Sequence, residues 1–235
     1  MASQALISQH RDQLLRLQSL VERDLNAFWR TLDVTRPVSV AEALEAHVRE
    51  LTLVYGDMAA ALAAAWYEEV RDAAGAAGYF SARLAEADQA KAGVVARWSA
   101  SSLFGESPAP EVALSRLVAG TQRIVHRAST ETVEENMSQD RAATGRFYRD
   151  ARADGCAFCL LVASRGPVYR SRESAGDGRR FHDHCYCVVV PDFGDYEEPA
   201  KVSRFLEQYE KAREKAGSSN ARDILSALRT VTGAA

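Results

Sequence analysis

The clearest structural pattern in this chain of 235 residues lies in residues 39–66, which read SVAEALEAHVRELTLVYGDMAAALAAAW. Large apolar side chains recur there every three or four residues, as on one face of an α-helix. They are Leu44, Val48, Leu51, Tyr55, Met58, Leu62 and Trp66. Ser39 and Glu42 have the spacing of a capping box, in which the serine accepts a hydrogen bond from a backbone N–H and the glutamate reaches back to another. The pattern predicts a long helix that ends at about Ala73.

The same periodicity appears on both sides of this stretch, so we expect residues 1–140 to form a helical region. An earlier helix should end before Pro37, and a third should run from about Phe80 to Leu103. A fourth should follow a turn at residues 105–110, and a shorter, arginine-rich helix is predicted from Gln139 to Asp154. The three tryptophans are expected to pack in the core; they are Trp29, Trp66 and Trp98.

The pattern changes after residue 154, where glycine-containing turns separate short segments with strand propensity at residues 168–171 and 186–190. We therefore predict a mainly α fold. It is a long-helix bundle with a small zinc-stabilised β-hairpin lobe near residues 155–191, followed by C-terminal helices. In terms of domains, the helical region precedes a Cys/His lobe at residues 141–193 and C-terminal helices at residues 194–235.

All four cysteines of the chain fall within 32 residues, and two of its five histidines lie in the same window. These residues are Cys156, Cys159, His182, His184, Cys185 and Cys187. Cysteine and histidine are the ligands that tetrahedral zinc prefers, and a CxxC pair can face one ion from a tight turn. Cys185 and Cys187 are two residues apart, so on an extended strand both would point to one face. The window predicts a structural zinc site, with a disulfide or reduced thiols as alternatives.

Six candidates compete for the four positions of a tetrahedral site. The preferred set is Cys156, Cys159, His182 and Cys185, with Cys187 close behind. His184 is expected to lie outside the coordination sphere or to be exposed. Zinc would explain how so small a lobe stays folded, because a core of that size supplies little stability. Since four protein ligands leave no open position for water, the metal is expected to be structural and not catalytic.

The sequence shows no signal-peptide pattern and no apolar run of membrane-spanning length, so we expect an intracellular protein with no membrane contact. In a reducing compartment, paired cysteines favour metal binding over disulfides. A zinc deaminase needs HxE before its PCxxC, whereas here the CxxC comes first. An HNH-type nuclease is the nearest enzyme, but the asparagine expected downstream is missing. We therefore predict no catalytic residues and no enzyme, with a metal-dependent nuclease as the alternative.

Charge is distributed unevenly along the chain, whose formal net charge is −3. Residues 141–180 contain nine arginines, no lysine and four acidic residues, so this segment carries +5 and the remainder −8. A solvated loop face is one interpretation of this segment. The other is non-specific contact with the phosphates of DNA.

The cysteine window resembles the MuF-like minor head proteins of tailed phages, also described as phage head morphogenesis proteins. The residues that carry the resemblance are Cys156–Cys159, Leu160–Tyr169 and Phe181–Pro191, in a form similar to that of actinobacteriophages. The resemblance implies a minor capsid protein that associates with the portal protein and with major capsid or scaffold proteins. It would lie in the capsid interior or at the portal vertex of the virion, and in the host cytoplasm during assembly. A capsid maturation protease is sometimes linked to such genes, but the sequence shows no protease triad or dyad.

Overall fold

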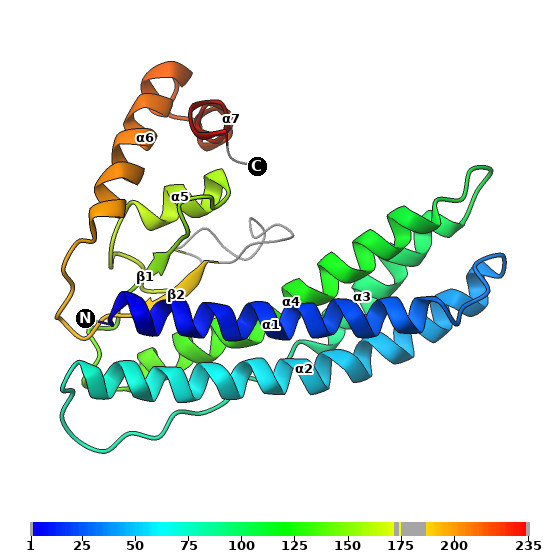
Figure 1. Ribbon diagram of the computed structural model, residues 1–235, viewed down its shortest axis with the longest axis horizontal. Helices are drawn as coiled ribbons and strands as arrows, with labels where there is room; N and C mark the ends of the chain where they lie inside the picture. The colour runs from blue at the N-terminus through cyan, green and yellow to red at the C-terminus, as the bar shows by residue number, and fades with distance from the viewer. Residues whose placement is uncertain (1, 172–173, 175–186, 234–235) are drawn as a thin grey trace. The chain divides into compact units, whose positions relative to one another are not determined.

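The computed structural model describes residues 2–171, 174 and 187–233. In these residues the chain is mainly helical, which confirms the predicted fold class at this level (Figure 1). The helices are α1 (Gln4–Trp29), α2 (Pro37–Ala73), α3 (Gln89–Ala100), α4 (Pro110–Gln139), α5 (Ala157–Ala163), α6 (Ala200–Ala216) and α7 (Ala221–Thr232), with a 3-10 turn at Ser101–Leu103. The strands are β1 (Phe147–Asp150) and β2 (Val188–Pro191).

The chain folds into two compact units whose segments alternate along the sequence. The first unit contains the chain up to Arg11, Trp66–Ala82 and the chain from Val133 onward. The second unit contains Asp12–Ala65 and Arg83–Thr132. Helices α1, α2 and α4 therefore each contribute to both units. No helix in the described part of the chain is long and apolar enough to cross a membrane.

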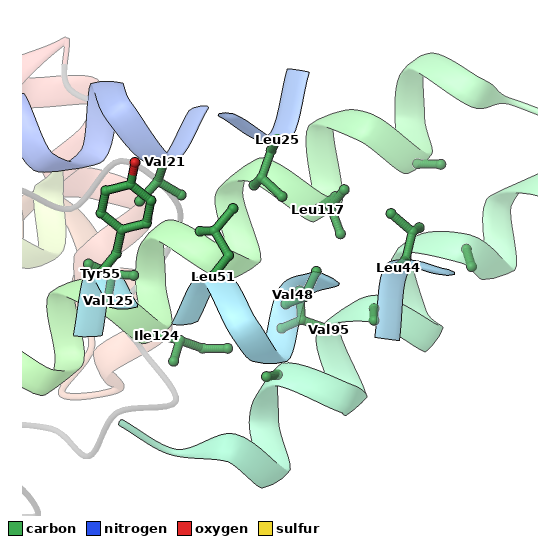
Figure 2. Close-up of a cluster of buried hydrophobic side chains, with 14 of the residues drawn as sticks. Val21, Leu25, Leu44, Val48, Leu51, Tyr55, Val95, Leu117, Ile124 and Val125 are labelled. Atoms are coloured by element: carbon green, nitrogen blue, oxygen red, sulfur yellow. The ribbon is translucent and has the colours of Figure 1, made fainter. Parts of the chain in front are cut away.

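The second unit is a helical bundle around an apolar core. Figure 2 shows side chains from α1, α2, α3 and α4 that meet in this core. Those labelled are Val21, Leu25, Leu44, Val48, Leu51, Tyr55, Val95, Leu117, Ile124 and Val125. Most of the periodic residues of α2 are buried, as the helical periodicity predicts, but Met58 is 44% exposed.

The first unit holds the two strands and the C-terminal helices. Strand β1 pairs with β2 in antiparallel register, with Arg149 opposite Val189. Both strands are buried along their whole length. Helices α6 and α7 pack against each other, and they are the two C-terminal helices that the sequence predicts. Gly217 ends α6 at a φ of +57°, and Asn220 begins α7 by accepting a hydrogen bond from the N–H of Arg222.

Two predicted helices differ from those observed. The third helix begins only at Gln89, because the Asp88 side chain accepts a hydrogen bond from the N–H of Lys91 and so caps the helix there. The predicted helix from Gln139 to Asp154 is wrong, since α4 ends at Gln139 and residues 147–150 form β1. Phe147 and Tyr148 are aromatic residues that favour strands, but the arginines around them favoured the prediction of a helix.

The predicted β-hairpin lobe near residues 155–191 is also wrong in which residues form its strands. Its first strand comes from residues 147–150, and residues 157–163 form a helix. Of the segment at 168–171, only Tyr169 pairs, in an isolated bridge with Phe147. The described residues therefore give no support to a local, zinc-stabilised hairpin. The two strands that pair, β1 and β2, lie far apart in the sequence.

The tryptophans divide into different environments. Trp66 is 2% exposed, which confirms its predicted place in the core, and Trp29 is half-buried against the core of the second unit. The prediction for Trp98 is wrong, because this side chain is 44% exposed. The guanidinium of Arg116 lies over its ring at 4.8 Å from the centroid, a cation–π contact that suits an exposed aromatic side chain.

Candidate metal centre

The geometry of the strand pair places Arg149 and Cys187 on one face of the sheet. Arg149 lies opposite Val189, and Cys187 is two residues before Val189. Side chains alternate between faces along a strand, so Cys187 is the diagonal neighbour of Arg149 on the same face. The Nη1 of Arg149 donates a hydrogen bond to the Sγ of Cys187 at 3.5 Å.

The CxxC segment forms the first turn of α5. Cys156 is extended, with φ −61° and ψ 159°, and its Sγ accepts a hydrogen bond from the N–H of Cys159 at 3.3 Å. The carbonyl of Cys156 accepts from the N–H of Leu160 at 3.0 Å. The tight turn predicted from the CxxC spacing is therefore present, and it continues into a short helix that is buried throughout.

The three described cysteines belong to one small apolar cluster. Cys159 and Cys187 are buried in it, and Cys156 is half-buried against it. Its other members are Ala151, Leu160, Ala163 and Phe205. Residues separated by nearly 30 positions in sequence thus meet on the face of the sheet that α5 covers.

Arg149 is a charged residue of this region and is only 1% exposed. Tyr169 lies near it, since the positive charge of Arg149 acts on the Tyr169 phenol. Burial is the main cause that raises the pKa of Tyr169, whose hydroxyl donates to the carbonyl of Val162 at 2.9 Å. That hydrogen bond ties the segment after α5 to the helix itself.

The opposite face of β1 carries a buried carboxylate, Asp150. It accepts hydrogen bonds from Arg11, forms an ion pair with Lys201 at 2.5 Å, and lies 3.5 Å from the amide nitrogen of Gln4. Arg11 also donates to the backbone carbonyl of Asp150 at 3.2 Å. These contacts attach the start of α1 and α6 to the strand within the first unit.

The predicted metal ligands are placed only in part. Cys156, Cys159 and Cys187 share the cluster, whereas His182, Cys185 and His184 lie outside the described residues. Within the ranges that the structure describes, no group of three or more His, Cys, Asp or Glu side chains is gathered as a metal site. Zinc binding therefore stays a prediction, and so does the choice of four ligands.

Sequence reasoning missed the role of Arg149 at this site. We counted it with the nine arginines of residues 141–180, but its burial removes it from any surface. Arg152 is exposed and is paired with Asp154, with both of its hydrogen bonds at 2.8 Å. No local signal placed Arg149 inside, because both faces of β1 are buried and residues 147–150 show no alternation of apolar and polar side chains.

Comparison with known proteins gives the family of this chain. The family model described as "VG15 protein" matches residues 1–212, so the chain belongs to the VG15 protein family. One relative is the Gene 15 protein of Mycobacterium phage D29, which is 26% identical over 139 residues, 43% of this chain and 48% of that protein. The chain thus spans about half the length of this relative. No solved structure matches the chain. These findings indicate a phage protein.

Proposed function

We propose that this chain is a structural minor capsid protein of a tailed phage that associates with the portal and acts in head assembly, and so in DNA packaging or ejection. Membership of the VG15 family and the mycobacteriophage relative support a phage protein. The observation that carries the finer proposal is the spacing of the cysteine window, which resembles that of MuF-like minor head proteins. Long helices offer extended surfaces for contact with portal, scaffold or major capsid proteins.

The proposed role is structural and not enzymatic, because the Cys/His pattern fits a filled metal site and lacks the residue order of the zinc enzymes considered. The alternative, a metal-dependent nuclease or capsid maturation protease, makes a different prediction. A purified enzyme of that kind would cleave DNA with a divalent metal ion, or would process the capsid precursor. The structural proposal expects neither product.

The direct test is the protein content of assembling heads. Mass spectrometry of purified procapsids should detect this chain at a fixed ratio to the portal, and co-expression with the portal should give a complex that co-purifies. A host protein of similar size and abundance serves as the control for contamination. If procapsids lack the chain while containing the portal, the proposal fails.

We also propose that the lobe around α5 binds one structural zinc ion. Cys156 and Cys159 are two of its ligands, and the other two come from His182, Cys185 and Cys187. The shared cluster of the three described cysteines and the N–H donated to Cys156 Sγ support this donor set. Zinc would link α5 to the segment before β2 and so hold the fold of the lobe together.

Elemental analysis of the purified protein should give close to one zinc per chain. Cys156→Ser should reduce this ratio and lower the melting temperature. Ser164→Ala, at the other end of the same short helix, changes a buried side chain that is no candidate ligand and should leave the ratio unchanged. A metal-free wild-type protein would contradict the zinc proposal without affecting the proposed place in the virion.

A further inference from the structure

Exposed apolar side chains gather at two places on the second unit. Single exposed hydrophobic side chains are normal on a protein surface, but groups of them mark interaction sites. Twelve large hydrophobic side chains are exposed in the described part of the chain, and six of them belong to two surfaces of this unit. Three of the six are on α2, and three are on the pair of helices α3 and α4.

The first surface, called the α2 face below, lies on the solvent side of that helix. Leu51 and Tyr55 point into the core of the second unit (Figure 2), whereas the residues next to them in sequence point away from it. The exposed residues follow one another at the three- and four-residue spacing of a single helix face. They are Leu53, Val54, Asp57, Met58 and Ala61. Asp57 is the charged residue of this face, and its carboxylate has no ion pair with any described residue.

The second surface, called the α3–α4 face below, is centred on Trp98. Val94 lies one turn before Trp98 on α3, and Val112 lies one turn before Arg116 on α4. The Arg116 guanidinium covers the Trp98 ring at 4.8 Å from its centroid, and its Nη1 donates to the Oγ of Ser102 at 2.6 Å. No carboxylate among the described residues pairs with Arg116. A guanidinium has five N–H donors, so this side chain keeps donors for a further acceptor.

We propose that the α2 face of one copy of this chain binds the α3–α4 face of another, with Asp57 paired to Arg116. Each face is apolar around one ionised side chain, and the two ionised side chains have opposite charge. A carboxylate accepts two parallel hydrogen bonds from a guanidinium, so this pair would fix the position of one face on the other. The aliphatic side chains of the α2 face then cover Trp98. This proposal does not rest on the proposed role in the virion.

The charges also decide which faces can meet. If the α2 face bound its own counterpart, two carboxylates would enter one apolar contact, and two α3–α4 faces would bring two guanidinium groups together. Like charges in an interface are costly, so both symmetric arrangements are disfavoured. The contact is therefore heterologous, and it can continue from copy to copy or close into a ring or a pair. Each face covers only a few helical turns, so we expect a weak, concentration-dependent association.

The mass of the full-length protein in solution provides the first test, measured by sedimentation from about 1 to 100 μM. The mean mass of the wild type should rise with concentration. Asp57→Arg places two arginines in the contact and Arg116→Glu places two acids there, so each variant should stay monomeric. Asp12→Arg and Arg30→Glu make the same charge changes at exposed places outside both faces, and they should associate like the wild type. Circular dichroism checks that all four variants are folded.

A mixture of the two monomeric variants tests the pairing itself. When Asp57→Arg meets Arg116→Glu, one contact joins the two introduced side chains and the other joins the native Asp57 and Arg116. Opposite charges then face each other in both, so an equimolar mixture should associate although neither variant does so alone. Trp98→Ala should weaken association about tenfold or more, as loss of an interface tryptophan does. Tyr79→Ala is its control, because Tyr79 is 95% exposed outside both faces.

Three results would overturn the proposal. The wild type could stay monomeric up to about 100 μM, or it could associate equally well in both single variants. The third is a mixture that does not associate, which would show that Asp57 and Arg116 do not pair. If the chain alone is monomeric but Asp57→Arg and Arg116→Glu lose a co-purifying portal, the faces bind another protein and not a second copy. That last result would support the proposed place in the virion while excluding self-association.

Discussion

At the scale of single residues, β1 carries two neighbouring buried charges, Arg149 and Asp150, whose side chains contact different partners on opposite faces of the strand. Arg149 points to the cysteine cluster, while Asp150 points to the other face and contacts Arg11 and Lys201. The carboxylate is 1% exposed as a side chain, so it is removed from water and depends on these partners. Asp150 therefore serves as an anchor for α1 and α6.

Replacing this carboxylate should be strongly destabilising. In Asp150→Asn the amide cannot offset the charge of Arg11, whose side chain is only 9% exposed. Breaking a buried ion pair by removing one partner costs about 3–5 kcal/mol in unfolding free energy. Urea denaturation followed by circular dichroism should show this as a large fall in the unfolding midpoint.

The matched control for this change is Asp154→Asn. Asp154 pairs with Arg152 and its hydrogen bond with that arginine lowers its pKa, but its side chain is 68% exposed. Solvent screens such a pair, so the unfolding midpoint should scarcely move. Equal effects of the two substitutions would show that the burial of Asp150 carries no special stability.

The sequence indicated which cysteines gather at the candidate site, but it did not indicate which other side chains contact them. The clustering of cysteines and the CxxC spacing indicated Cys156, Cys159 and Cys187, which the fold brings into one cluster. The contact of Arg149 with Cys187 could not be predicted, because it depends on the register of two strands separated by nearly 40 residues. Such a register is fixed by tertiary pairing, which local patterns do not encode.

At the scale of elements, close packing of α3 and α4 depends on a glycine. A Cβ built on Gly120 would lie 2.6 Å from Cγ1 of Val95, closer than real carbon contacts allow. Val95 is itself part of the second unit's core (Figure 2). The absence of a side chain at residue 120 is therefore what lets the two helices approach.

Gly120→Ala should destabilise the protein although alanine favours a helix. The propensity gain of up to about 1 kcal/mol is outweighed by overpacking, which costs about 1–3 kcal/mol. Thermal or urea unfolding would measure the net loss. The second change Val95→Ala should restore part of the stability lost to Gly120→Ala, because it removes the methyl groups that clash.

A helical glycine with different neighbours provides the control. Around Gly93 the closest atoms are the ends of the flexible side chains of Arg49, Glu45 and Arg97, at 2.8–3.2 Å. These ends can move, so Gly93→Ala should be neutral or slightly stabilising through its helix propensity. A loss as large as that at residue 120 would contradict the proposed difference between rigid and flexible neighbours.

Element prediction succeeded where periodicity was long and failed where it was short. Helix α2 ends at Ala73 as expected, and the two C-terminal helices are present. Strand β1 was mistaken for helix because four residues carry too little periodic signal against a background of arginines. Helix α5 was missed for a similar reason, since a buried apolar run of seven residues fits a strand as well as a helix.

At the scale of the whole molecule, the alternation of segments between two units could not be inferred from composition. Helices α1, α2 and α4 each contribute residues to both units, and no proline- or glycine-rich linker marks the division. Apolar periodicity identifies the buried face of a helix but not the partner that covers it. The two cores thus emerge only from tertiary contacts.

Charge is the other property of the whole molecule that bears on function. Burial of Arg149 and pairing of Arg152 reduce the arginines of residues 141–180 that could reach a ligand. Arg141, Arg146, Arg165 and Arg170 remain exposed in the described part of that segment. These four side chains are therefore the ones to test for contact with DNA.

The last prediction is that these exposed arginines bind DNA phosphates and not bases. Fluorescence anisotropy with two unrelated duplexes should show equal, weak binding at about 50 mM salt that is largely lost at about 200 mM, because phosphate contacts release counterions. The double variant Arg165→Gln, Arg170→Gln should weaken binding and reduce the slope of log affinity against log salt by about 0.9 for each phosphate contact removed.

The matched control for that variant removes the same charge from another exposed place on the chain. Arg30→Gln with Arg36→Gln lies outside the arginine-rich segment and changes the net charge equally. If net charge alone governed binding, the two double variants would weaken it alike; a local phosphate contact requires the effect to be larger for Arg165 and Arg170. No binding at the lower salt would leave the segment as a solvated face, because the −8 carried by the rest of the chain would then repel DNA unopposed.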